Sequence, residues 1–291
     1  MTRKVDLLYD AKSFILENGD IADKLEIMAA GFDFGENYIK SSITELGTYL
    51  NPDGGLPFDL NQENPSSVKT TSEILRLIME LDLNVEVDFV PRMVDFLVSR
   101  QKKDGGFAET LNLDMPIEDK YGSGEGRDWY PVAKSITWLT GKALESLCKA
   151  GFDGTERLRR ARDFLLYSQN EDGHWPDYKG QETSDPLGTG NILPALREVG
   201  VSEDSDVYED GRAALMHHLM TAIEQGNAFD MVDLIAVGDP KNRKEEELIQ
   251  NGLVLIKESQ NPDGGWSLPG FKKSDAELTA SLAYVFEKCC Q

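Results

Sequence analysis

The sequence predicts an all-α protein, an α/α toroid of six inner and six outer helices. The first observation is a recurring unit, in which apolar residues are followed by a Gln, an Asp-Gly turn and an aromatic residue. Copies occupy 164–175, 96–107 and 255–266, and a weaker copy at 53–55 lacks the Gln. Three copies with the same internal spacing favour a repeat protein.

The second observation is that consecutive helices alternate in polarity. The first helix of a pair is charged, as at 157–163 and 244–247, whereas the second is apolar on all sides, as at 231–237 and 278–284. A helix with a polar face lies outside, and one that is apolar all round is enclosed. Six such pairs predict a closed double ring, which removes the exposed ends of an open solenoid.

The third observation is the chemistry of the repeat itself. A Gly just past a helix end adopts the left-handed conformation that closes the helix without a Cβ penalty. A Gln side chain carries two donors and one acceptor, so it can bond loose carbonyls of its own helix and loose amides of a neighbouring one. Each repeat is therefore expected to fasten one helical hairpin to the next.

Helical periodicity places the expected elements along the chain. The helix at 130–151 is expected to start at Tyr130, because Pro131 is tolerated in a first turn. The long polar connection at 108–128 is expected to be functional. With no linker-like stretch, the chain is predicted to be a single domain, residues 1–291. The remaining helices are expected at 5–16, 21–30, 36–50, 67–79, 88–101, 155–169, 188–199, 208–225, 228–237, 244–260 and 274–290.

Composition excludes several classes of protein. The chain has 291 residues with 40% hydrophobic content and a net charge of −22, which argues against a nucleic-acid partner. No apolar run reaches the length of a membrane span, and the start of the sequence lacks the apolar segment of a signal peptide. Three cysteines, two of them adjacent, form no disulfide framework, so the expected location is cytoplasmic. The oligomeric state stays open.

The repeat resembles the Gln-Trp motif of the terpenoid cyclase and protein prenyltransferase family. The resemblance implies an α/α toroid whose inner helices line a central cavity for isoprenoid chains. It therefore implies a small apolar substrate. The residues that carry the resemblance are Arg160, Ala161, Phe164, Leu165, Gln169, Gly173 and Trp175 in one copy, and Gly252, Leu255, Ile256, Gln260, Gly265 and Trp266 in another.

The acids of that family are missing at the matching positions. Squalene-hopene cyclases and class II diterpene cyclases protonate an alkene with an Asp-x-Asp-Asp motif near a Tyr-Pro-type start of an inner helix. The matching stretch here, 130–137, contains no acid, and the motif occurs nowhere in the chain. The Asp, Cys and His zinc ligands of the prenyltransferases also have no counterpart, so neither a metal nor another cofactor is expected.

Two acids in the stretch 228–237 are candidates to replace the missing ones. Asp230 and Asp233 are three residues apart and share one helix face. Asp233 has apolar neighbours, and a desolvated carboxyl there could stay protonated and act as a general acid. Phe229 is expected to contact the substrate. The alternatives are that Asp230 helps to cap its helix and that Asp233 is a hydrogen-bonded buried carboxyl.

Further candidates surround the end of the long connection. Asp128 is either a helix cap or an acid at the mouth of the cavity. Trp129, Tyr130 and Trp138 could line the cavity and stabilise carbocations through cation–π attraction, or could simply pack between helices. Lys134 is four residues from both Tyr130 and Trp138, so on a helix it would share their face and could hold a diphosphate.

Glu73, one turn into its expected inner helix, is an alternative acid or substrate contact. Three functions remain open on these residues. The first is a terpene-cyclase-like enzyme that uses a non-standard acid, and the sequence leans towards it. The second is a binding protein for isoprenoids or lipids that lacks catalysis, and the third is an unrelated reaction in the same toroid.

Overall fold

Consecutive helices form six pairs in the computed structural model, which describes residues 6–81, 83, 87–123 and 127–290. Short elements between them are η1 (Phe58–Leu60), η2 (Leu111–Leu113), α6 (Asp114–Tyr121), β1 (Trp266–Ser267) and β2 (Ser274–Asp275). The pairs are α1 (Ala11–Asn18) with α2 (Ile21–Ala30), α3 (Glu36–Gly47) with α4 (Val68–Glu80), α5 (Val90–Arg100) with α7 (Thr137–Lys149), α8 (Thr155–Leu166) with α9 (Pro186–Glu198), α10 (Asp206–Gln225) with η4 (Phe229–Val237), and α11 (Arg243–Glu258) with α12 (Ala276–Cys289).

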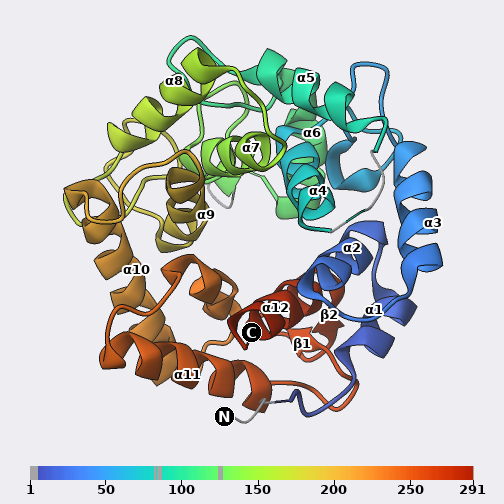
Figure 1. Ribbon diagram of the computed structural model, residues 1–291, viewed down its shortest axis with the longest axis vertical. Coiled ribbons are helices and arrows are strands. Elements are labelled where there is room, and N and C mark those ends of the chain that lie inside the picture. The colour runs from blue at the N-terminus through green and yellow to red at the C-terminus, as the bar shows by residue number, and fades with distance from the viewer. Residues whose placement is uncertain (1–5, 82, 84–86, 124–126, 291) are drawn as a thin grey trace. The chain divides into compact units, whose positions relative to one another are not determined.

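The chain divides into two compact units. Unit 1 combines Met1–Ser42 with Leu215–Gln291, and unit 2 is the continuous stretch Ile43–Ala214. In unit 2, α7 packs against both α4 and α9, and in unit 1, α12 packs against both α2 and η4 (Figure 1). The sequence-based expectation of one domain over residues 1–291 stays a prediction.

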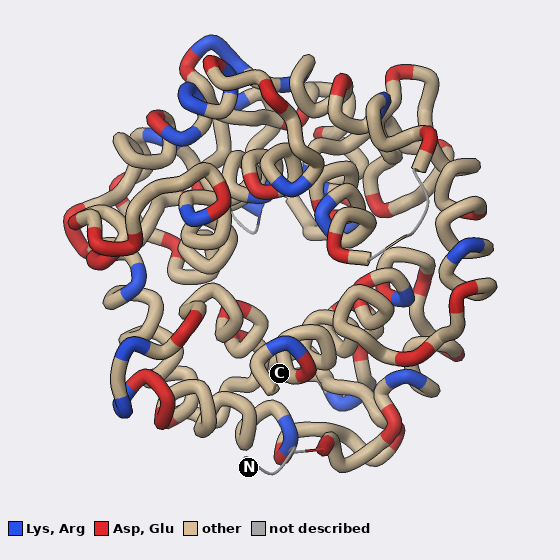
Figure 2. Tube along the Cα trace, in the orientation of Figure 1, with Lys and Arg blue, Asp and Glu red and all other residues tan. Residues whose placement is uncertain are grey.

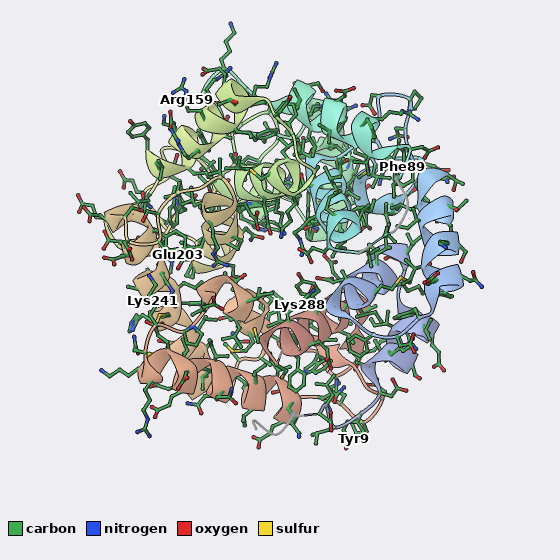
Figure 3. The ribbon with its side chains drawn as sticks, in the orientation of Figure 1. Tyr9, Phe89, Arg159, Glu203, Lys241 and Lys288 are labelled. Atoms are coloured by element: carbon green, nitrogen blue, oxygen red, sulfur yellow. The ribbon has the colours of Figure 1, made fainter. Side chains whose placement is uncertain are left out.

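The predicted alternation of polar and apolar helices is confirmed in unit 2. Helix α7 buries residues on every side, whereas α8 buries only Ala161, Phe164 and Leu165. The charged side chain of Arg159, on the opposite side of α8, extends away from the helix (Figure 3). Outer helices also meet end to end, because the ring of Phe89, ahead of α5, lies against Gly47 at the end of α3.

The Gln of each full repeat bridges two hairpins, as predicted. Gln101 Nε2 donates to the carbonyl oxygen of Gly105 at 3.0 Å and to that of Arg157, in the first turn of α8, at 2.8 Å. The other copies repeat this arrangement: Gln169 donates to Gly173 and Val207, and Gln260 donates to Gly264 and Tyr9. The indole N–H of the Trp that follows each of the last two turns donates to the helix ahead of that turn. Trp175 donates to the carbonyl of Leu165, and Trp266 donates to that of Ile256.

The Asp of each turn ties the turn to the start of the next inner helix. Asp104 Oδ1 accepts from Gly106 N at 3.1 Å and from Ser135 Oγ at 2.9 Å, and Ser135 lies just ahead of α7. Sequence reasoning did not identify this Ser. The other copies have the same bonds: Asp53 with Gly55 and Ser66, Asp172 with His174 and Ser184, and Asp263 with Gly265 and Ser274.

The first Gly of each turn is required by its backbone conformation. Gly105 has φ 97°, where a side chain is strained, and its Cα faces the backbone of Arg160 in α8. An added Cβ would collide with the Arg160 carbonyl. Gly105 is left-handed as predicted, but it does not close the helix as expected, because α5 ends at an extended Gln101 and Gly105 lies in the turn that follows. Its conformation allows the close approach of the next outer helix.

The predicted helix start at Tyr130 is wrong, because α7 begins only at Thr137. Ile136 is extended, and its N–H donates to the carbonyl of Phe107 at 3.0 Å, so tertiary pairing holds this backbone outside a helix. Ala133 has φ 60°, which also interrupts a helix. The expectation that Lys134 shares a helix face with Tyr130 and Trp138 is therefore wrong as well.

Three other boundaries differ from the sequence-based expectations. Helix α1 starts at Ala11, where Asp10 accepts from Ser13 N at 3.0 Å, and residues 1–5 lie outside the described residues. The polar connection at 108–128 contains α6, and its residues 124–126 also lie outside the described ranges. The element at 229–237 is a 3-10 helix, in which positions three apart are aligned.

Candidate active site

The expected site residues lie in both units. Unit 2 holds the group around Trp138, and unit 1 holds the group on η4. The first group comprises Glu73, Asp128, Trp129, Tyr130, Lys134 and Trp138, and the second comprises Phe229, Asp230 and Asp233.

The aromatic residues expected to line a cavity form one cluster. Trp129 stacks on Tyr130 with ring centroids 5.3 Å apart, and Tyr130 meets Trp138 edge to face at 4.9 Å. The indole of Trp138 donates to the carbonyl of Trp129 at 3.1 Å, and Tyr121 of α6 packs on Trp129 at 5.0 Å. This arrangement brings together three residues that the sequence placed in one site.

Glu109 fixes the cluster to the start of α4. Its carboxylate accepts from Ser67 Oγ at 2.7 Å and from the backbone N–H groups of Val68 and Lys69, which belong to the first turn of α4, where the helix supplies no acceptor of its own. It also accepts from the Tyr130 hydroxyl at 2.8 Å, so the cap of α4 orients the ring of Tyr130. Burial raises the pKa of Glu109, and these hydrogen bonds oppose the rise.

A carboxyl that sequence reasoning missed lies beside the aromatic cluster. Asp177 is 7% exposed, and its backbone carbonyl accepts from the N–H of Thr137, the residue before Trp138. Gln181 donates to its Oδ2 at 3.2 Å, while within the described part of the chain Oδ1 is enclosed without a hydrogen-bond partner. Burial, followed by the charge of Asp185, raises the pKa of Asp177 to about 7.

Asp185 and Asp128 complete this acidic group. Asp185 caps α9 by accepting from Leu187 N at 3.1 Å, and its side chain is also hydrogen-bonded to Asp177. A Cβ built on Gly188 would lie 3.7 Å from Asp185 Oδ2 and 3.8 Å from Trp138 Cβ, so Gly188 of α9 lies between the carboxyl of Asp185 and the start of α7. Asp128 is exposed, and its charge also raises the pKa of Asp177.

Asp23 in unit 1 is a second buried acid with a raised pKa. Burial, followed by the charge of Asp20, raises its pKa to about 7. Its side chain accepts from Asp20 N at 2.9 Å and so completes a capping box at the start of α2. A helix cap accounts for this acid, whereas the side chain of Asp177 is bonded to Gln181 and Asp185, and its backbone carbonyl accepts from Thr137 N at the start of α7.

Lys134 lies beside a different ring from the one expected. Its side chain is exposed, with Nζ 4.3 Å from the ring centroid of Tyr178, the residue after Asp177. An isolated β-bridge joins Ile136 to Tyr178, which brings Lys134, two residues before Ile136, near that ring. The lysine therefore borders the acidic group.

Glu73 is held between two lysines. Its carboxylate lies 2.9 Å from Lys69 Nζ on α4 and 3.0 Å from Lys142 Nζ on α7. Burial alone would raise the pKa of Glu73, but the attraction of Lys69 and Lys142 outweighs it and lowers the pKa to about 2. This carboxylate stays ionised at neutral pH, which fits the alternative role of general acid poorly.

The ion pairs continue along the half-exposed side of α4, α7 and α9. Glu80 pairs with Arg76 at 2.9 Å and with Lys149 at 3.5 Å, and Lys149 also pairs with Glu198 of α9 at 3.3 Å. Figure 2 shows acidic and basic positions interspersed on these helices. The inner helices were expected to present an apolar lining, but this face of unit 2 is charged.

The acids of η4 have different surroundings. Asp230 Oδ2 lies 3.0 Å from His218 Nε2 of α10. No side chain caps η4, so Asp230 does not have the expected capping role, and Asn227 Oδ1 accepts from Phe229 N at 3.2 Å. Asp233 is buried, with 8% exposure, as its apolar neighbours predict. Phe229 is half-buried. The catalytic role of this group stays a prediction.

In the described ranges, no group of three or more His, Cys, Asp or Glu is arranged to hold a metal ion. Within the same residues, none of the helices has the length and apolarity that crossing a lipid bilayer requires.

Comparison with solved structures defines the class of fold. The type II terpene cyclase MstE from Scytonema superposes with a TM-score of 0.67 at 14% identity, over 96% of each chain. A variant of that protein in complex with geranylgeranyl dihydroxybenzoate superposes with a TM-score of 0.70 at 13% identity, over 96% of this chain and 95% of that one. The chain therefore has the α/α toroid fold that its repeats predict.

Sequence comparison points to the same proteins. The family model for the squalene-hopene cyclase C-terminal domain matches residues 66–188. The squalene–hopene cyclase of Alicyclobacillus acidocaldarius is 28% identical over 252 residues, which cover 74% of this chain but only 37% of that protein. Together with the fold, these matches confirm the resemblance to the terpenoid cyclases that the repeats indicate.

Proposed function

We propose that the protein is a terpene-cyclase-like enzyme that protonates an isoprenoid double bond. The observation that carries the proposal is Asp177, a buried carboxyl whose pKa is raised to about 7 beside an aromatic cluster. A general acid works best when its pKa lies near the working pH, because it is then both protonated and able to give up its proton. Asp177 meets that condition at neutral pH.

The proposed step moves one proton and one electron pair. The π electrons of the double bond take the proton of Asp177, which forms a C–H bond and leaves a carboxylate and a carbocation. In this proposal the rings of Trp129 and Trp138, whose centroids lie 5.8 Å apart, stabilise the carbocation through cation–π attraction. The cation then reacts with another double bond of the chain or loses a proton, and that proton returns to the Asp177–Asp185 pair, so no co-reactant is needed.

The substrate class is taken from chemistry and from the structural relatives. Protonation requires a double bond in an apolar chain, and MstE has been captured with geranylgeranyl dihydroxybenzoate as its substrate. A small molecule with an isoprenoid chain is therefore the proposed ligand. Because the chain corresponds to 37% of the length of squalene–hopene cyclase, this activity is proposed for the chain and not transferred from that protein.

Asp233 is the second candidate for the acid. It too is buried, and with Asp230 and Phe229 it formed the group favoured by the sequence. Asp177 is preferred because its pKa is raised and because the aromatic cluster lies in the same unit.

The test compares two matched variants. Wild type, Asp177→Asn and Asp233→Asn are incubated with geranyl, farnesyl and geranylgeranyl diphosphates and with geranylgeranyl dihydroxybenzoate, and products are measured by mass spectrometry. Loss of a general acid lowers turnover by about 10²- to 10⁴-fold, and this loss is expected for Asp177→Asn alone. A loss of turnover in Asp233→Asn alone would identify Asp233, on η4, as the general acid.

A non-catalytic isoprenoid-binding protein is the alternative function. It is favoured by the matching stretch at 130–137, where Lys134 and Ser135 occur and Asp-x-Asp-Asp does not. Absence of turnover in the wild type with all four substrates, together with an isoprenoid that co-purifies and is seen by mass spectrometry, would establish this alternative over the enzyme.

A further inference from the structure

The contact between α5 and α8 in unit 2 carries a concentration of positive charge. Lys102 and Lys103 are exposed in the turn after α5, and Arg160 Nη2 of α8 donates to their carbonyl oxygens at 2.6 and 2.8 Å. Arg157 is exposed on the same helix and donates to Val98 O at 3.1 Å. Within the described residues, none of these four cations is in an ion pair with a carboxylate. We call Lys102, Lys103, Arg157 and Arg160 the basic corner.

The other end of α8 is acidic. The turn after α8 docks on the start of α10, where Gln169 Nε2 donates to Val207 O at 2.9 Å. Glu171 is exposed in this turn, and Glu209 and Asp210 are exposed on α10. In the part of the chain that the structure describes, no lysine or arginine forms an ion pair with these three carboxylates. We call Glu171, Glu209 and Asp210 the acidic corner.

The repeat itself does not require these charges. The position of Lys103 is taken by Pro52 in the first repeat, by Glu171 in the third and by Pro262 in the last. The backbone hydrogen bond that closes the turn nevertheless recurs in all four copies. Opposite charges at two neighbouring corners therefore serve something other than the formation of the turns.

Between the two corners, the charges on α8 balance one another. Arg159 pairs with Glu156 and with Asp163, each at 2.8 Å, and it extends away from the helix (Figure 3). Helix α8 has 12 residues, so it is about 18 Å long and separates the corners by little more than that. Figure 2 shows basic positions gathered where α5 meets α8 and acidic positions where the chain leads into α10.

We propose that this face is a dimer interface, on which the α8 helices of two copies of the chain lie antiparallel about a two-fold axis. An axis through the middle of α8 places the basic corner of each copy against the acidic corner of the other, so both ends are matched at once. Tyr167, which is 81% exposed just past the end of α8, then faces the partner's cations.

A second copy fits this face better than any other acidic partner. A separate acidic protein would neutralise the basic corner and leave the acidic corner unmatched. The net charge of −22 makes two copies repel one another at long range, so the attraction must come from groups within about 8 Å at physiological salt. Unpaired charges of opposite sign at the two ends of one helix meet this requirement.

The experiment measures association by sedimentation velocity over a range of protein concentrations. One variant reverses the basic corner, with Lys102→Glu and Lys103→Glu. A second variant reverses the acidic corner, with Glu171→Lys and Glu209→Lys. All four side chains are exposed, so the variants should fold, and circular dichroism checks this. The two variants are studied separately and as an equimolar mixture.

The matched control is Lys272→Glu with Lys273→Glu. These lysines are also adjacent and exposed, but they lie in unit 1. The control therefore makes the same change in net charge as the reversal of the basic corner without altering either corner.

We expect wild type and control to dimerise alike, and each reversed variant alone to dimerise at least about tenfold more weakly, because like charges then oppose one another. The mixture should dimerise again, since the acidic corners of one variant then meet the basic corners of the other. A monomeric wild type, an equal loss in the control, unchanged dimerisation of both reversed variants, or a monomeric mixture would overturn the proposal. None of these outcomes depends on the proposed catalysis.

Discussion

The side chain of Gln260 bonds both backbone groups of Tyr9, a residue 251 positions earlier in the chain. Tyr9 N donates to Gln260 Oε1 at 2.8 Å, and Gln260 Nε2 donates back to Tyr9 O at 3.1 Å (Tyr9 is labelled in Figure 3). The same Nε2 also donates to Gly264 O at 2.9 Å. The last repeat thus holds the segment ahead of α1 and joins the two segments of unit 1, in addition to the packing of α12 on α2.

Replacement of Gln260 should lower the free energy of unfolding. Gln260→Ala removes three hydrogen bonds and leaves the buried carbonyl of Gly264 without its partner, so we expect a loss of roughly 2–4 kcal/mol in unfolding free energy. Urea denaturation followed by circular dichroism measures it. Gln101→Ala, which removes two bonds in the equivalent position of unit 2, should lose less. Equal losses would show that the bond to Tyr9 N contributes little.

Glycine substitutions separate backbone strain from steric conflict. Gly105→Ala combines a left-handed backbone with a collision against the Arg160 carbonyl, so a loss of more than about 3 kcal/mol is expected. Gly180→Ala has a similar φ, 91°, but open space around its Cα, so a loss of about 1 kcal/mol is expected. Thermal unfolding of both variants tests the difference, and similar melting temperatures would contradict it.

The raised pKa of Asp177 predicts a particular pH dependence of stability. An unfolded Asp releases its proton near pH 3.8 and Asp177 in the folded chain near pH 7, so the folded state holds more protons in between. Stability then falls as pH rises through this window. Relative to wild type, Asp177→Asn should therefore gain stability between pH 4 and pH 8, by roughly 2–4 kcal/mol. A pH-independent difference in urea midpoints would refute the raised pKa.

Glu73 should give the opposite dependence of stability on pH. Its pKa is lowered to about 2, so its ion pairs stabilise the fold above the ordinary pKa of 4.5, and this contribution is lost as pH falls through about 2. Glu73→Gln should be roughly 2 kcal/mol less stable than wild type at pH 7, with a deficit that shrinks towards pH 2. Denaturation midpoints at pH 3, 5 and 7 measure this trend. A deficit that grows in acid would refute it.

The repeats could be predicted from the sequence because their chemistry is local. Spacing alone revealed Gln101 and Gly105, and hydrogen-bonding capacity indicated that the glutamine joins two hairpins. Its partners differ from those expected, because Gln101 donates to carbonyls of its own turn and of the neighbouring helix. The start of α7 could not be predicted in this way, because Pro131 favours a helix start locally while the pairing of Ile136 with Phe107 overrides it. The positions of the turns could be predicted because neighbouring residues determine them. The start of α7 could not, because it depends on a contact between residues that are distant in sequence.

The candidate site was predictable only in part. Trp129, Tyr130 and Trp138 are close in sequence, and the structure brings them together. Asp177 gave no signal, because it lies in a polar turn and its raised pKa arises from burial and from Asp185, eight residues away. Glu109 follows the Gly-Gly-Phe turn, and that position was the available hint of its role as a cap for α4.

The division of the chain has a consequence for its synthesis. Residues 43–214 of unit 2 are continuous, so they can fold on the ribosome as soon as they emerge. Residues 6–42 must instead wait for α12 and for Gln260 before their contacts exist, and their apolar helix α2 stays uncovered during that time. Chaperones would therefore be needed for this segment during translation. A slow final phase of refolding would correspond to the packing of this segment against α12.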